Sequence, residues 1–275
     1  MIDRIRKWLK RTERKIALSK REEFVIVTII LTLGLVLSQL MSLEWRYPMV
    51  VLLSLVAYAG SAIALREDLK GVEWLTLLVL PTLFTAAVGL FYFLLPVRWA
   101  TRLPVAAAYG VGMYALLLTE NIYNVAAQRG IGLLRAAHSV GFLLSLVTYF
   151  LLLSTTLSFR LPVFFNAVVI GIVSFFLVLQ SVWSYELTPI ISKRVGEVVL
   201  ATSLVFFEFT WVLYFWPMKP ILVALLLTTG FYSFVGIAQQ YIVEKLYKRT
   251  IVEFLAVFVI VFLLGMMTTH WRGPV

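Results

Sequence analysis

Long apolar stretches without charge constrain this chain more than any other feature. Six of them contain no Lys, Arg, Asp or Glu, and three further ones are shorter or hold a single acid. A helix needs about 20 mostly apolar residues to cross a bilayer, whereas barrel strands are alternating segments of about ten. The sequence therefore predicts an all-α, polytopic transmembrane helical bundle of nine spans, or eight if the last one does not cross: 24–43, 47–65, 74–97, 103–119, 136–159, 161–185, 198–218, 220–243 and 254–271.

The composition excludes a soluble enzyme. Hydrophobic residues make up 61% of the 275 residues and charged ones only 14%. Soluble domains are about half apolar and a quarter charged. The chain has no Cys, which excludes disulfides and thiolate metal sites.

The distribution of Lys and Arg predicts the orientation. With nine crossings, the side that holds the N-terminus carries 18 of the 24 basic residues and the other side carries six. Basic residues stay in the cytoplasm, so we expect a cytoplasmic N-terminus and a C-terminus outside. The expected location is a cell membrane, and the lack of Cys and of organelle signals fits a prokaryotic plasma membrane.

Residues 1–23 form a basic head before the single transmembrane domain at 24–275. Ile2, Ile5 and Leu9 share one face of a helix there, and Arg or Lys residues cover the other. We expect this helix to lie on anionic inner-leaflet lipids rather than to dock an acidic partner or nucleic acid.

Basic residues followed by proline begin the four helices that enter from outside. The motifs are Arg46-Tyr-Pro48, Arg102-Leu-Pro104, Arg160-Leu-Pro162 and Lys219-Pro220. Proline suits a first helical turn, and free N–H groups there favour an anion. Arg102, Arg160 and Lys219 are therefore a candidate outer anion mouth. The simpler interpretation, which we favour, is that each side chain reaches outer-leaflet phosphate on its own.

Ionisable residues within spans are the first candidates for function in a membrane protein. Glu120 and Asn124 share a face four residues apart, and Arg135 and His138 follow across a short glycine-containing connection. Glu120 is expected to pair with Arg135 or His138. The group is either a substrate cup or proton-linked gate, or a buried ion pair that locks one hairpin, and we favour the ion pair.

Glu208 is the other candidate, because it stands alone in an aromatic stretch of its span. A carboxyl facing lipid is costly, so we expect Glu208 to face the bundle, either protonated or paired.

Catalytic motifs do not narrow the function further. The sequence contains no H-E-x-x-H, no G-x-S-x-G and no nucleotide-binding glycine pattern, so we expect no cofactor and no metal. The leading hypothesis is transport or flipping of a small anionic solute or lipid. The second is a scaffold that binds membrane-protein partners or further copies of itself, and the third, less expected, is a lipid-modifying enzyme.

Overall fold

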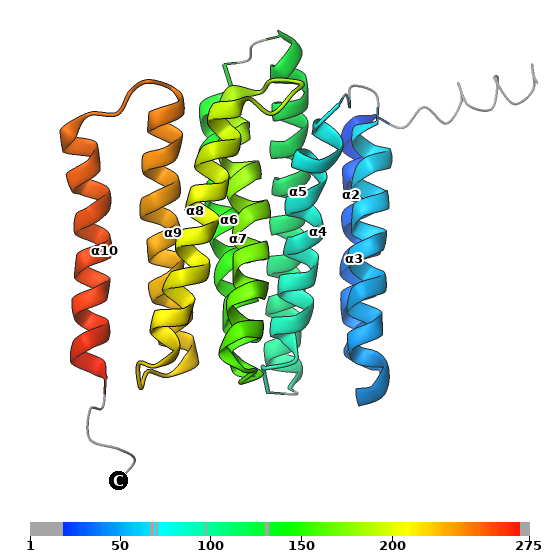
Figure 1. Cartoon of the computed structure of the whole chain (residues 1–275). Helices are drawn as coiled ribbons and strands as arrows, with labels where there is room; N and C mark the ends of the chain where they lie inside the picture. The colour runs from blue at the N-terminus through cyan, green and yellow to red at the C-terminus, as the bar shows by residue number, and fades with distance from the viewer. Residues whose placement is uncertain (1–18, 67–68, 70, 97, 130–131, 270–275) are drawn as a thin grey trace, which may run out of the picture.

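The computed structural model describes residues 19–66, 69, 71–96, 98–129 and 132–269, and all regular secondary structure in these ranges is helical. The predicted all-α class is confirmed. The helices are α2 (Lys20–Ser38), α3 (Leu43–Leu65), α4 (Glu73–Tyr92), α5 (Trp99–Arg129), α6 (Leu134–Ser158), α7 (Val163–Glu186), α8 (Lys193–Tyr214), α9 (Pro220–Ile242) and α10 (Lys248–Thr268) (Figure 1).

Eight of these helices, α3 to α10, are long and apolar enough to cross a membrane. They indicate a multi-pass membrane protein. The last helix, α10, is continuous over 21 residues, so the last predicted span is also long and apolar enough to cross a membrane. The helix outside this set is α2, which is the shortest and lies beside α3 (Figure 1). Its first four residues are charged, which leaves an apolar part of 15 residues.

A capping box fixes the beginning of α2. The Ser19 hydroxyl accepts a hydrogen bond from the Glu22 backbone N–H, and the Glu22 carboxylate accepts one from the Ser19 N–H. This pairing satisfies two N–H groups that a helix start leaves without partners. Residues 20–23, assigned to the head from sequence, therefore belong to α2. The predicted surface helix at 1–18 lies outside the described residues.

Successive helices alternate in direction, so the bundle has two ends (Figure 1). We call the end where α2 begins the N-terminal face and the end where α10 finishes the C-terminal face. The α4–α5, α6–α7 and α8–α9 connections lie at the C-terminal face. Which face meets the cytoplasm remains the prediction made from the basic residues.

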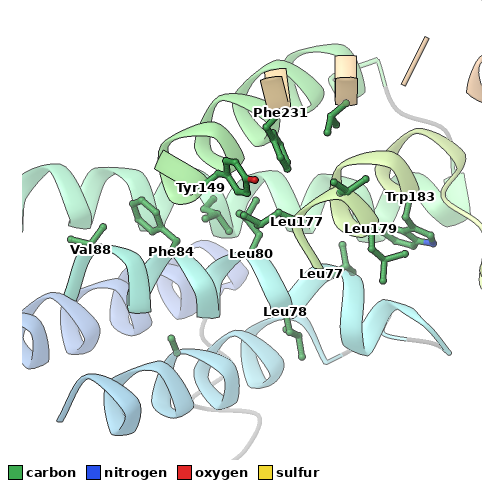
Figure 2. Packing of buried hydrophobic residues seen from close by; sticks show 14 of the residues in the cluster. Leu77, Leu78, Leu80, Phe84, Val88, Tyr149, Leu177, Leu179, Trp183 and Phe231 are labelled. Carbon is green, nitrogen blue, oxygen red and sulfur yellow. The ribbon is translucent and has the colours of Figure 1, made fainter. Parts of the chain in front are cut away.

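The centre of the bundle is built from α4, α6, α7 and α9. Trp183, Leu177, Tyr149 and Phe231 pack there with leucines of α4 (Figure 2). Tyr149 bonds Ser174 across α6 and α7 at 2.8 Å. Helices approach closely where small residues leave room, and a Cβ at Gly112 of α5 would lie 2.8 Å from the Phe84 ring.

The four prolines differ from the sequence expectation in one respect. Pro220 is the first residue of α9 and Pro162 is the N-cap of α7, as expected for a helix start. Pro48 and Pro104 instead lie five residues inside α3 and α5. Those two helices begin before the basic residue, because apolar and aromatic residues extend them toward the C-terminal face.

Candidate functional site

Glu120 lies on α5, in the half nearer the N-terminal face, and is fully buried. Its Oε1 accepts a hydrogen bond from Gln180 Nε2 of α7 at 3.0 Å, and its Oε2 has no partner among the described residues. The side-chain Oε1 of Gln180 accepts in turn from the Ser145 hydroxyl of α6 at 3.4 Å. The carboxyl is therefore held by neutral dipoles rather than by a cation.

The expected pairing of Glu120 with Arg135 or His138 is wrong. Arg135 is exposed at the start of α6. His138 is half-buried, donates from Nε2 to the Ser184 carbonyl oxygen at 2.8 Å, and stacks on Tyr185 with ring centroids 3.9 Å apart. Both residues lie among the first five of α6, where Arg135 is exposed and the His138 ring bonds and stacks on α7.

Asn124 is buried on the same face of α5 as Glu120, as the spacing predicted. Its Nδ2 donates to the Leu65 carbonyl oxygen at the end of α3, 3.2 Å away, and its Oδ1 has no partner. Two unpartnered acceptors thus lie one helical turn apart on α5. Unpaired buried acceptors are costly, and these two oxygens have hydrogen-bonding capacity that the described residues leave unused.

A column of buried polar side chains, interrupted by the buried Ile170 and Leu177, follows one face of α7. At 100° per residue its members fall within an arc of about 120°. Each of these side chains is at most 3% exposed. The column runs nearly the length of the helix and comprises Asn166, Ser174, Gln180, Ser181 and Ser184.

Glu208 does not face the bundle, contrary to the prediction. It is exposed on α8, on the same stripe as Leu204 and Val212, which are 56% and 65% exposed. The buried face of α8 is instead formed by Phe206 and Thr210 on the opposite side. The spacing of these buried residues would have predicted this orientation, and the prediction relied only on the cost of a lipid-facing acid.

A cavity of about 240 Å³ opens at the C-terminal face between the ends of α6 and α8 and the beginnings of α7 and α9. Its polar lining comes from Arg160, Asn166, Thr210, Tyr214 and Trp216. Its apolar lining comes from Leu157, Leu213, Met218, Pro220 and Val223. We call it the C-terminal pocket.

One of the three predicted anion-mouth residues, Arg160, lines this pocket. Lys219 is exposed and does not line it, although its sequence neighbours Met218 and Pro220 do. Arg102 lies elsewhere, and its Nη2 donates to the Gln39 carbonyl oxygen beyond the end of α2, 3.3 Å away. The three residues therefore do not form one mouth, because α5 packs beside α2 while α7 and α9 surround the pocket.

Asn166 is a buried residue in the first turn of α7. Its Nδ2 donates to the nearby Leu161 carbonyl oxygen at 3.0 Å, and its buried Oδ1 has no partner among the described residues. Gln180, the other buried amide of α7, bonds across helices to Glu120. The clue to Asn166 in the sequence is its place in the first turn after Arg160-Leu-Pro162, where a polar residue faces the helix end.

Among the described residues, no three His, Asp or Glu side chains gather in a way that could hold a metal ion. The helices bring together two groups of polar residues. The C-terminal pocket, lined by Arg160, lies at the beginning of α7, and the buried Glu120 carboxyl, whose Oε2 can accept a further hydrogen bond, lies near the end of α7.

The fold and this arrangement define the class as an all-α bundle of apolar, membrane-length helices with buried polar groups. The family described as "Protein of unknown function (DUF5656)" matches residues 27–268, and the chain belongs to that family. Neither the curated proteins nor the solved structures contain a match to the chain.

Proposed function

We propose that the protein transports or flips a small anionic solute or lipid across a cell membrane. The observation that supports this proposal best is the buried polar column of α7. The column begins at Asn166 in the C-terminal pocket and reaches Gln180, which binds Glu120. Asn166 and Gln180 are 14 residues apart, which is about 21 Å at 1.5 Å per residue.

The two ends of the column have different roles in this proposal. The C-terminal pocket receives the anion at Arg160, and the Glu120 group changes partners as the cargo or an accompanying proton passes. Carboxyl, amide and hydroxyl groups inside the bilayer are typical of such pathways. Because Glu120 and Gln180 are at most 2% exposed, the Glu120 group is closed toward both faces in this conformation. Passage requires other conformations that open it to each face in turn.

Reconstitution into liposomes tests the proposal. One assay follows a fluorescent phosphatidylglycerol between leaflets, and the other follows uptake of radiolabelled glycerol 3-phosphate. We expect the wild-type protein to accelerate one of the two, and Glu120→Gln to slow that movement at least tenfold. Glu253→Gln is the matched control, since Glu253 is an exposed acid of α10 that pairs with Arg249 at 2.9 Å.

The result decides between clear alternatives. Rates equal to those of protein-free liposomes for both cargoes would contradict transport of this class. Movement that Glu120→Gln and Asn166→Leu both leave unchanged would show that the α7 column is not the route.

The second candidate function is that of a scaffold for other membrane proteins, and the exposure of Glu208 favours it. A carboxyl on an apolar, lipid-facing stripe gains most from a partner span that places a basic or amide side chain against it. A photo-reactive amino acid at Val212, on the same stripe, tests this in cells. A defined protein adduct that Glu208→Leu abolishes supports the scaffold, and adducts with lipid alone contradict it.

A further inference from the structure

The C-terminal pocket combines a basic rim with one hydrogen-bond acceptor whose orientation is fixed. The amide nitrogen of Asn166 must face the Leu161 carbonyl oxygen that it bonds at 3.0 Å. The amide oxygen therefore points away from Leu161. It is buried and has no partner among the described residues, and Asn166 is one of the residues that line the pocket. A ligand in the pocket that carries an O–H or N–H donor would satisfy it.

The rim of the pocket favours an anion. Arg160 lines it, and its backbone adopts a left-handed φ of 50°, which non-glycine residues rarely adopt. Lys219 is the N-cap of α9, and the first turns of α7 and α9 both border the cavity. Helix N-termini and an arginine fork both suit phosphate oxygens, and none of the lining residues is acidic.

The size of the pocket limits what it can enclose. Its volume of about 240 Å³ is smaller than the 300–1,000 Å³ typical of pockets that enclose drug-sized ligands. Leu157, Leu213 and Val223 provide apolar walls, so a polar head fits inside while apolar chains extend along the helices toward the bilayer.

We infer that the C-terminal pocket binds a phosphate ester of a small polyol, with its phosphate at Arg160 and a hydroxyl donating to the Asn166 Oδ1. The ligand is either the head group of a membrane lipid or a free phosphate ester, because both present the same groups. This inference rests on the proposed function in one respect, since it names the class of cargo that the pocket would accept.

Binding to the purified full-length protein tests the inference without any flux measurement. Native mass spectrometry in detergent compares retention of phosphatidylglycerol, phosphatidic acid and phosphatidylcholine, and calorimetry measures glycerol 3-phosphate. We expect phosphatidylglycerol to be retained above the other two lipids. Glycerol 3-phosphate that binds and displaces it identifies a soluble ligand, and failure to displace it identifies the lipid head group.

Three variants separate the contributions of the pocket. Arg160→Gln should weaken retention of both anionic lipids at least tenfold. Asn166→Leu should remove the preference for phosphatidylglycerol over phosphatidic acid, because only the former carries free hydroxyls on its head group. Val223→Phe narrows the cavity and should weaken binding of both, which keeps the inference testable if Asn166→Leu does not fold. Arg135→Gln, an exposed arginine at the opposite face, is the control.

The inference is overturned if no anionic probe binds better than phosphatidylcholine, or if Arg135→Gln weakens binding as much as Arg160→Gln. Its failure is distinguishable from failure of the proposed function. If no anionic probe binds the wild-type protein better than phosphatidylcholine while flux persists, only the inference is removed. Intact binding without flux for either cargo removes only the transport proposal.

Discussion

Replacing Gln180 with leucine removes the one hydrogen bond that holds Glu120. The two side chains have similar volumes, so packing changes little. The Glu120 Oε1 loses its donor at 3.0 Å, and the Ser145 hydroxyl loses one of its two acceptors. A buried polar group left without a partner costs about 1–3 kcal/mol, so we expect Gln180→Leu to lower the free energy of unfolding by that amount.

A double-mutant cycle isolates the bond itself. When Glu120→Leu is combined with Gln180→Leu, both polar partners are gone and the double variant should recover part of the loss. Couplings between transmembrane helices average about 0.6 kcal/mol and reach about 1.7 kcal/mol. We expect a value near the upper limit, because the bond is fully enclosed.

Unfolding by sodium dodecyl sulfate in mixed micelles, followed by tryptophan fluorescence, measures these energies. Glu197→Leu is the control, since Glu197 is an exposed acid of α8 and its loss should change stability by less than about 0.5 kcal/mol. A coupling indistinguishable from zero would refute the reasoning, because it would show that Glu120 and Gln180 do not depend on each other.

Three further predictions concern packing and capping. Gly112→Ala should destabilise the bundle by about 1–3 kcal/mol, since the added Cβ would lie 2.8 Å from the Phe84 ring. Gly196→Ala is the control: its added Cβ would meet no neighbouring side chain within 4 Å, so it should be neutral or stabilising in the same unfolding assay. Trp183→Phe should cost about 1–3 kcal/mol, because it leaves the Thr188 carbonyl oxygen without the indole N–H that now donates at 2.8 Å; retention of wild-type stability would contradict this bond. Hydrogen bonds from Ser19 lower the pKa of Glu22, so the capping box stabilises the start of α2 above the ordinary carboxyl pKa and is lost as the pH falls through the lowered pKa. Amide hydrogen exchange at the start of α2 should therefore accelerate as the pH falls through that value. Glu22→Gln should remove this pH dependence.

The helical architecture followed from the sequence because apolar runs of about 20 residues admit one solution in a bilayer. Helix boundaries were less predictable. The capping box at Ser19 extends α2 into the charged head, and α3 begins before Arg46 although that residue was expected outside the span. Side-chain hydrogen bonds set the start of α2, and hydropathy marks only the apolar stretch within each helix.

The candidate site was predictable only in part. The burial of Glu120 and Asn124 followed from their spacing, but their partners lie on α7 and α3, and no pattern in the sequence places those helices beside α5. Glu208 was misplaced because the prediction rested only on the cost of a carboxyl that faces lipid. The neighbouring residues bury the opposite face of α8. The C-terminal pocket requires four helix ends to meet, which is a property of the packing.

In the proposed function, the C-terminal pocket and the Glu120 group lie toward opposite sides of a membrane. The chain has no native Cys, so single cysteines report position without background. Ile190, before α8 at the end nearer Gln180, and Phe215, after α8 beside the pocket, are 74% and 72% exposed. A membrane-impermeant maleimide applied to intact cells should label Phe215→Cys and reach Ile190→Cys only after the cells are opened. Labelling of both positions from one side would contradict the claim.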